Sequence, residues 1–142
     1  MGKQISIRVV PKPRLILKKR LGAGLDAYNK SKMGYLNGKD LGLEARSSKG
    51  LLIGGLVGRT YWGWLQVFEL WVHPTYRAQG LGSQLIEQAE TLAKKRGCKY
   101  IQLDTFSFQA PDFYKKLGFK QFGVLKPFPK GHSRIYLFKK IS

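Results

Sequence analysis

The order of apolar and polar residues along this chain predicts strands and helices in alternation. Short runs of apolar and β-branched residues, bounded by glycine, proline or other turn-forming residues, are typical of buried strands. These runs predict strands over residues 5–10, 41–46, 51–60, 65–72, 100–106, 121–125 and 134–138. Pro11 and Pro13 end the first strand, and residues 47–50 form a hairpin turn after the second. The last two strands are expected to pair antiparallel.

Three helices are predicted among these strands. Residues 80–96 have the clearest helical pattern, with Gly97 as C-cap and one apolar face made of Leu81, Leu85, Ile86, Ala89, Leu92 and Ala93. A leucine-rich helix over residues 14–32 is interrupted at residues 22–24, and a short helix covers residues 110–117. The elements together predict an α/β (α+β) fold, a central mixed sheet with flanking helices, in a single domain over residues 1–142.

The segment between the strand at 65–72 and the helix at 80–96 has the composition of an anion site. The strand ends at His73 and Pro74, and the sequence R-A-Q-G-L-G then leads into the helix from Arg77 to Gly82. A helix N-terminus presents unpaired backbone N–H groups and the positive end of the helix dipole. Because Gly80 and Gly82 have no Cβ atoms, a phosphate could approach this backbone closely.

The order R-x-x-G-x-G after a strand ending in V-H-P resembles the acetyl-CoA signature of the GNAT superfamily of N-acetyltransferases. A second block, F-Y-K-K-L-G-F over residues 113–119, is similar to the downstream Y-x-x-x-G-F element of that superfamily. The stretches at 103–111 and 131–133 resemble a small bacterial single-domain subgroup. The resemblance implies an acetyl-CoA-dependent transferase in which two adjacent parallel strands of a mostly antiparallel sheet splay apart and admit the cofactor.

The same resemblance assigns cofactor-binding residues. Main-chain groups of Leu70, Trp71 and Val72 would pair with the pantetheine amides as an added strand. The CoA pyrophosphate would be held by backbone N–H groups of the turn, which comprises Arg77, Ala78, Gln79, Gly80, Leu81, Gly82 and Ser83. Ser107 stands where the family often has an asparagine that touches pantetheine, so a shorter side chain must make that contact here.

Tyr114 is the catalytic residue that the resemblance implies, and the general base is unassigned. Acyl transfer to an amine expels the CoA thiolate. A phenol with a pKa of ~10 can donate a proton to this thiolate, because the thiol that forms has a pKa of ~8.5, which is close to that of the phenol. Family members often place Glu or His where this chain has Gln66 and Phe68. Strand alternation turns the neighbouring Glu69 away unless a bulge reverses it. The other candidates are His73, Asp112 and His132, or no base at all.

The charge of the chain bears on its partners. The sequence has 26 Lys and Arg against 8 Asp and Glu, a net charge of +18, which attracts polyanions such as CoA. The resemblance implies that acceptor specificity resides near residues 15–34 and 126–132, and that the acceptor is a primary amine of a small molecule or a protein. A basic rim there favours an acceptor that carries acid groups or is bound to nucleic acid, unless a local acidic pocket at Asp26, Asp40 and Glu44 reverses the sign. A basic nucleic-acid-binding module, or a GNAT-like domain that binds acyl-CoA without transfer, remain alternatives.

Composition sets the remaining expectations. The chain has no run of about 18 apolar residues and no secretory pattern at its start, so we expect no membrane association. Cys98 is its only cysteine, which predicts a small filler residue and a reducing, cytoplasmic compartment. Its two histidines and one cysteine are not at metal-ligand spacing, so no metal is expected. The aromatic hairpin at 61–64 and the C-terminal strand are candidate edges of a homodimer.

Overall fold

The computed structural model describes residues 2–141 and divides the chain into two compact units, residues up to Leu36 and residues from Asn37 onward. Met1 and Ser142, the ends of the predicted single domain, lie outside the described residues. The first unit contains one helix, α1 (Leu15–Met33), which ends at Gly34, where the N–H donates to the Lys30 carbonyl. No helix within residues 2–141 is long and apolar enough to cross a membrane.

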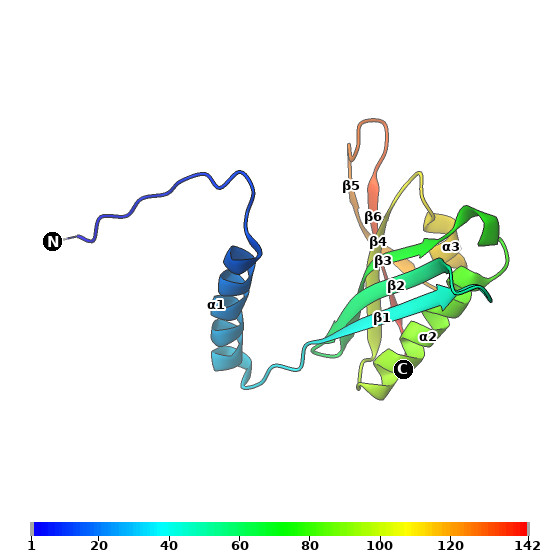
Figure 1. The fold of residues 1–142 in the computed structure, drawn as a ribbon, viewed down its shortest axis with the longest axis horizontal. Coiled ribbons are helices and arrows are strands. Elements are labelled where there is room, and N and C mark those ends of the chain that lie inside the picture. The colour runs from blue at the N-terminus through cyan, green and yellow to red at the C-terminus, as the bar shows by residue number, and fades with distance from the viewer. Residues whose placement is uncertain (1, 142) are drawn as a thin grey trace. The chain divides into compact units, whose positions relative to one another are not determined.

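The second unit is a six-stranded sheet with the order β1-β2-β3-β4-β6-β5 (Figure 1). Its elements are β1 (Lys39–Arg46), β2 (Leu52–Tyr61), β3 (Trp64–Val72), a 3-10 turn η1 (Pro74–Tyr76), α2 (Leu81–Lys95), β4 (Tyr100–Phe106), α3 (Pro111–Lys116), β5 (Lys120–Leu125) and β6 (Arg134–Lys140). Only β3 and β4 pair parallel, while all other neighbours pair antiparallel. This arrangement confirms the expected mixed, mostly antiparallel sheet with flanking helices.

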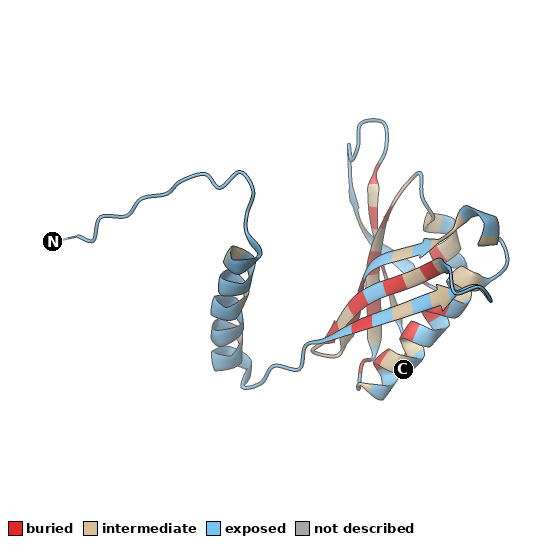
Figure 2. Cartoon of the chain, in the orientation of Figure 1, coloured by how far each residue is buried: buried red, intermediate tan, exposed pale blue. Residues whose placement is uncertain are grey.

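The core lies between one face of the sheet and α2. Leu56, Leu65, Ile101 and Leu137, one from each of four neighbouring strands, are almost fully buried on that face. The apolar side of α2 packs on this row with Ile86, Ala89 and Ala93. Figure 2 shows the buried residues concentrated in the strands and along the covered side of α2. Alternation along the strands and helical periodicity along α2 therefore meet in a single core, as their patterns predict.

β3 and β4 separate soon after they begin. Their parallel ladder consists of Trp64 with Tyr100, Leu65 with Ile101 and Gln66 with Gln102, and pairing ends there. Beyond this point, the edge of each strand that faces the other has no strand partner. The splay that the resemblance implies is present, and it opens beside the start of α2.

A bulge in β3 changes which residues share a face. Glu69 pairs with Val57, but Val67 pairs with the next residue, Gly58, so Phe68 has no partner on β2. One extra residue reverses the alternation that follows it. Glu69 consequently lies on the same open face as Gln66 and not on the α2 face. Regular alternation along β3 would turn the Glu69 side chain toward the α2 face. The bulge breaks this alternation at Phe68, so that orientation of Glu69 is wrong.

Two expectations for the N-terminal part are also wrong. Residues 5–10 form no strand, and their apolar side chains are exposed, with Ile5 at 84% and Ile7 at 96%. A strand requires a hydrogen-bonded neighbour, and no described residue supplies one. Helix α1 runs without interruption through residues 22–24, because isolated glycines cost about 1 kcal/mol each but do not by themselves break a helix.

A glycine pair tests the importance of the bulge for stability. A Cβ atom on Gly58 would overlap the Gln66 carbonyl oxygen, whereas one on Gly42 in β1 would meet nothing within 4 Å. We expect Gly58→Ala to lower the free energy of unfolding by about 1–3 kcal/mol, and Gly42→Ala to change it by less than about 0.5 kcal/mol. Denaturant unfolding followed by circular dichroism measures both. Equal losses would contradict the proposed crowding at the bulge.

Candidate functional site

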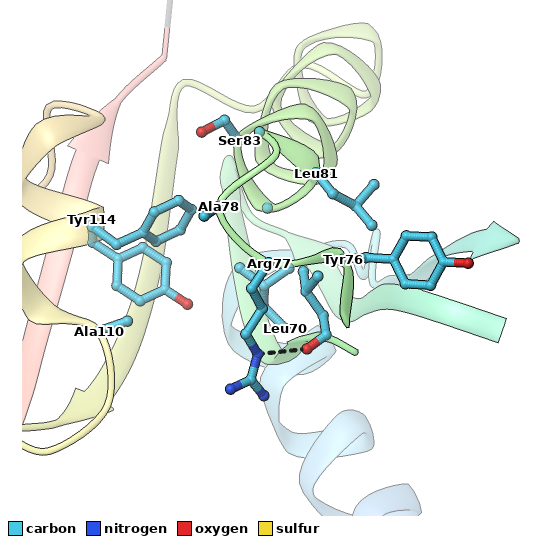
Figure 3. Close-up of a pocket in the computed structure, with 12 residues that line it drawn as sticks. Leu70, Tyr76, Arg77, Ala78, Leu81, Ser83, Ala110 and Tyr114 are labelled. Carbon is cyan, nitrogen blue, oxygen red and sulfur yellow. Dashed lines mark hydrogen bonds between the residues drawn. The ribbon is translucent and has the colours of Figure 1, made fainter. Parts of the chain in front are cut away.

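A cleft of about 480 Å³ opens where β3 and β4 part. Its walls come from the end of β3, the turn before α2, the first turn of α2, and α3 (Figure 3). The lining residues are Leu70, Val72, Tyr76, Arg77, Ala78, Gly80, Leu81, Gly82, Ser83, Ala110, Phe113 and Tyr114. The structure therefore brings the two motif blocks, which are some thirty residues apart in the sequence, to a single cavity.

Three residues of the expected cofactor set do not line this cleft. Trp71 lies on the open face of the sheet and is 45% exposed. The Gln79 side chain turns back and donates to the Thr75 carbonyl at 3.2 Å. Ser107 lines a different cavity, where its hydroxyl accepts from the Ser133 backbone N–H at 3.1 Å. The expected cofactor contacts of Trp71 and Gln79 use main-chain atoms, so the positions of their side chains do not bear on these contacts. The expected contact of Ser107 with pantetheine uses its side chain, which faces the other cavity.

The cleft also contains Tyr76, Ala110 and Phe113, which the sequence reasoning missed. Phe113 directly precedes Tyr114 in the second motif block, so its position in the sequence was a usable signal. A Cβ atom on Gly82 would lie 3.1 Å from the Phe113 ring. Gly82 thus permits α2 and α3 to approach each other closely, which is a packing role in addition to any role with a ligand.

The turn before α2 is held by its own polar groups. The Thr75 N–H donates to Nδ1 of His73 at 3.2 Å. The Arg77 Nε donates to the Val72 carbonyl at 2.9 Å (Figure 3). Ala78 and Gly80 both have positive φ, 60° and 82°, which turns the chain into the helix. The Arg77 contact ties the guanidinium to the end of β3 and leaves its outer nitrogens for a ligand.

The first turn of α2 has the features of an anion site. Gly80 is the N-cap, no side chain caps the helix, and the first turn contains no acidic residue. Backbone N–H groups at the start of a 15-residue helix are therefore left without protein side-chain acceptors beside the cleft. The helix dipole adds positive potential at the same point. A phosphate group would satisfy these donors.

Tyr114 lies on the opposite wall of the cleft. Its ring is buried, at 7% exposure, between Phe113 and Phe119, with ring centroids 5.0 and 5.6 Å away. The hydroxyl points into the cleft (Figure 3). Burial, reinforced by the negative charge of Asp104, raises the pKa of Tyr114 to about 12. The phenol is therefore protonated at every physiological pH and can act as a hydrogen-bond donor.

The candidate bases occupy different places. His73 uses Nδ1 to organise the turn, and Asp112 lies in the first turn of α3. His132 lines the second cavity with Ser107. Glu69 lies on the open face of the sheet beside the parting of the strands and forms no ion pair with another described residue. Within residues 2–141, no three His, Cys, Asp or Glu side chains gather in a way that could hold a metal ion.

Comparison with known proteins agrees with this geometry. The sequence model of the Acetyltransferase (GNAT) family matches residues 26–119. The blasticidin-S acetyltransferase of Streptomyces morookaense is 41% identical over 98 residues, which cover 68% of this chain and 72% of that protein. The crystal structure of an acetyltransferase from Bacillus cereus has a TM-score of 0.80 at 34% identity, with 94% of this chain and 97% of that chain covered.

A third relative was solved with a ligand. The crystal structure of a streptothricin acetyltransferase candidate from Bacillus anthracis is in complex with acetyl coenzyme A. It is 27% identical to this chain, with a TM-score of 0.63, and the match covers 71% of this chain and 62% of that one.

A second glycine pair tests the anion site. Gly80 and Gly97 lie at opposite ends of α2, both have φ of 82°, and neither has an atom within 4 Å of an added Cβ. We expect Gly80→Ala and Gly97→Ala to cost a similar free energy of unfolding, about 1 kcal/mol each. Only Gly80→Ala places a methyl group in the cleft, so only it should weaken acetyl-CoA binding, by about tenfold. Calorimetry measures this, and an equal effect of both variants would remove the turn from the cofactor site.

Proposed function

We propose that this chain, which belongs to the GNAT acetyltransferase family, transfers the acetyl group of acetyl-CoA to the nitrogen of an amine acceptor. The strongest support for the proposal is the arrangement of groups around the cleft. The uncapped start of α2 and the Tyr114 hydroxyl face the same cleft, at the only place where neighbouring strands of the described sheet separate. The first feature suits a phosphate-bearing cofactor, and the second suits its leaving thiolate.

The cofactor would lie along the end of β3. Its pyrophosphate would accept from the backbone N–H groups between Arg77 and Ser83, with a charge-assisted contact from Arg77. Its pantetheine amides would pair with main-chain groups of residues 70–72, on the side of β3 that β4 has left. This placement directs the thioester into the gap between the strands and toward Tyr114.

The chemistry requires three proton movements when the acceptor arrives as an ammonium ion. The acceptor first loses its extra proton. The neutral amine nitrogen then attacks the thioester carbonyl carbon and loses a second proton to solvent, and the C–S bond of the tetrahedral adduct breaks. The departing sulfur receives a proton, so that the products are an amide and CoA thiol. Tyr114 would donate a hydrogen bond to the sulfur as negative charge develops on it. Because burial raises its pKa to about 12, full transfer of the phenolic proton is less favourable than from a free tyrosine.

Glu69 would accept the extra proton of an acceptor that arrives as an ammonium ion. The bulge at Phe68 turns Glu69 onto the open face of the sheet with Gln66, at the edge where β3 and β4 part. Leu70 and Val72 line the cofactor cleft from the opposite face. An amine that enters from the open face would therefore meet a carboxylate before it reaches the thioester. Among the bases considered, His73 is committed to the turn, which favours Glu69.

The acceptor would be a small molecule, as it is for the blasticidin-S acetyltransferase by that relative's name. A protein amine is the second candidate, and no contact in the structure favours it. A cytoplasmic location would suit the single free cysteine, Cys98, which is buried. A homodimer through the hairpin at 61–64 or the C-terminal strand stays a prediction.

A tyrosine pair tests the acid. We expect Tyr114→Phe to lower kcat by about a hundredfold and to leave the Kd for acetyl-CoA within about threefold of the wild-type value. Tyr100→Phe is the matched control, since Tyr100 stacks on Trp64 at 4.6 Å outside the cleft. In the wild type, ionisation of Tyr114 should cause no loss of kcat until the pH approaches about 12. Release of CoA thiol reports the rate, and an unchanged kcat in Tyr114→Phe would exclude this residue from the mechanism.

A glutamate pair tests the base. We expect Glu69→Gln to lower kcat/KM by about tenfold to a hundredfold at neutral pH. The deficit should shrink as the pH rises toward the ordinary pKa of an alkyl amine, near ~10, because the acceptor then arrives without the extra proton. Glu87→Gln, on the exposed side of α2, should match the wild type. A deficit that is constant with pH would instead assign Glu69 to acceptor binding.

A further inference from the structure

A second cavity, of about 500 Å³, lies on the other side of the loop that follows β4. The loop between β5 and β6 forms its opposite wall. Ser107, Lys126, Pro127, Gly131, His132 and Ser133 line it. None of the residues of the cofactor cleft lines this cavity, so it is a distinct space.

Backbone hydrogen bonds hold the two walls of this cavity together. The Ser107 N–H donates to the Ser133 carbonyl at 2.8 Å, and the Ser133 N–H donates to the Ser107 hydroxyl at 3.1 Å. Within the β5–β6 loop, the Phe128 N–H donates to the His132 carbonyl at 3.0 Å, and the His132 N–H donates to the Pro129 carbonyl at 2.8 Å. The cavity is therefore shaped before any ligand arrives.

Two side chains of this cavity, His132 and Lys126, can donate hydrogen bonds to a ligand. The Ser107 hydroxyl accepts from Ser133, so its own hydrogen can point to Nδ1 of His132, 3.5 Å away. A neutral imidazole that accepts at Nδ1 keeps its hydrogen on Nε2 and can donate it to a ligand. Lys126 adds a cation that forms no ion pair with a described residue.

No carboxylate balances these donors. None of the eight Asp and Glu residues of the chain lines the cavity. Asp104, on the adjoining strand β4, is already paired with Arg134 at 2.8 Å. The site is therefore electropositive at short range and not only through the net charge of the chain.

An aromatic cluster borders the cavity. The Phe106 and Phe108 rings stack with centroids 5.5 Å apart, Phe128 lies 5.4 Å from Phe106, and the His132 ring meets Phe108 edge-on at 5.1 Å. Phe108 is 57% exposed and Phe128 is 38% exposed. Apolar surface of this kind beside an anion site suits an organic acid better than a free inorganic anion.

A short loop connects the cavity with the cofactor cleft. Ser107 lines the cavity and Ala110 lines the cofactor cleft, so the short loop between them separates the two spaces. This loop is fixed, because the Gln109 Oε1 accepts from the Phe106 N–H at 2.8 Å and the Thr105 hydroxyl accepts from the Ala110 N–H at 3.3 Å.

We propose that this cavity binds an acid group of the amine acceptor, with Lys126 and His132 as specificity-determining residues. The inference rests on the proposed acetyltransferase function and names the acceptor class: a small organic amine that also carries a carboxylate. Lys126 and His132 hold the carboxylate, and the aromatic cluster covers the adjoining apolar part of the molecule.

Benzoate and benzamide provide a test that requires no known acceptor, because they have similar shapes and differ in charge. The protein, saturated with acetyl-CoA, is titrated with each while the ring protons of His73 and His132 are followed by NMR. We expect benzoate to shift the His132 signal saturably and benzamide to leave it unchanged. Lys126→Ala should weaken benzoate binding by about tenfold. Lys130→Ala, in the same loop but outside the cavity lining, should change it by less than about twofold.

Each other outcome overturns the inference. Absence of a saturable shift, equal binding of benzamide, or equal effects of Lys126→Ala and Lys130→Ala would show that the cavity does not select a carboxylate. Acetyl-CoA binding by each variant is measured first and should equal that of the wild type. Normal acetyl-CoA binding by the wild-type protein without a benzoate response refutes the cavity assignment alone, whereas failure of the wild-type protein to bind acetyl-CoA refutes the proposed function.

Discussion

β3 and β4 are hydrogen-bonded through three residue pairs and then diverge, and the other features of the site follow from this separation. The edges of the two strands that face each other past Gln66 and Gln102 carry peptide groups that need partners. Water can serve, but a flexible ligand with its own amides can form a ladder there. The same divergence makes room for the start of α2 and for Tyr114 at one cavity. A fully paired sheet would close that cavity.

Under the proposed function, the sheet also separates the two substrates by face. The cofactor cleft draws on Leu70 and Val72, which share the α2 face, whereas the bulge turns Glu69 to the open face. The single extra residue Phe68 turns Glu69 away from the α2 face, and the proposed role of Glu69 as a base depends on this change. The two proposals divide the positive groups in the same way, with backbone donors and Arg77 assigned to the cofactor and Lys126 with His132 assigned to the acceptor. Each of these groups acts at one place in the structure. The proposed recognition of the two substrates therefore does not require that the net charge of +18 serve a specific partner.

Patterns that local geometry sets could be predicted from the sequence, as the helix at α2 and the splayed sheet show. The turn from Arg77 to Gly82 and the block around Tyr114 line one cleft, and their roles toward a ligand stay predictions. Sequence reasoning failed where the conformation of a segment depends on its pairing with a neighbouring strand. The bulge at Phe68 arises from the register with β2, and residues 5–10 have strand-like composition but no described partner. Ser107 was matched to an asparagine by position alone, and its hydroxyl is occupied by Ser133, a contact between residues 26 apart in sequence.

Calorimetric titration of the wild-type chain with acetyl-CoA at moderate salt, with ATP as a polyanion control, tests the central claim most directly. A cleft that recognises both a pyrophosphate and a pantetheine arm predicts saturable binding of acetyl-CoA at one site, with much weaker binding of ATP. Equal weak binding of both ligands, lost as salt increases, would show that charge alone attracts them and would contradict the account.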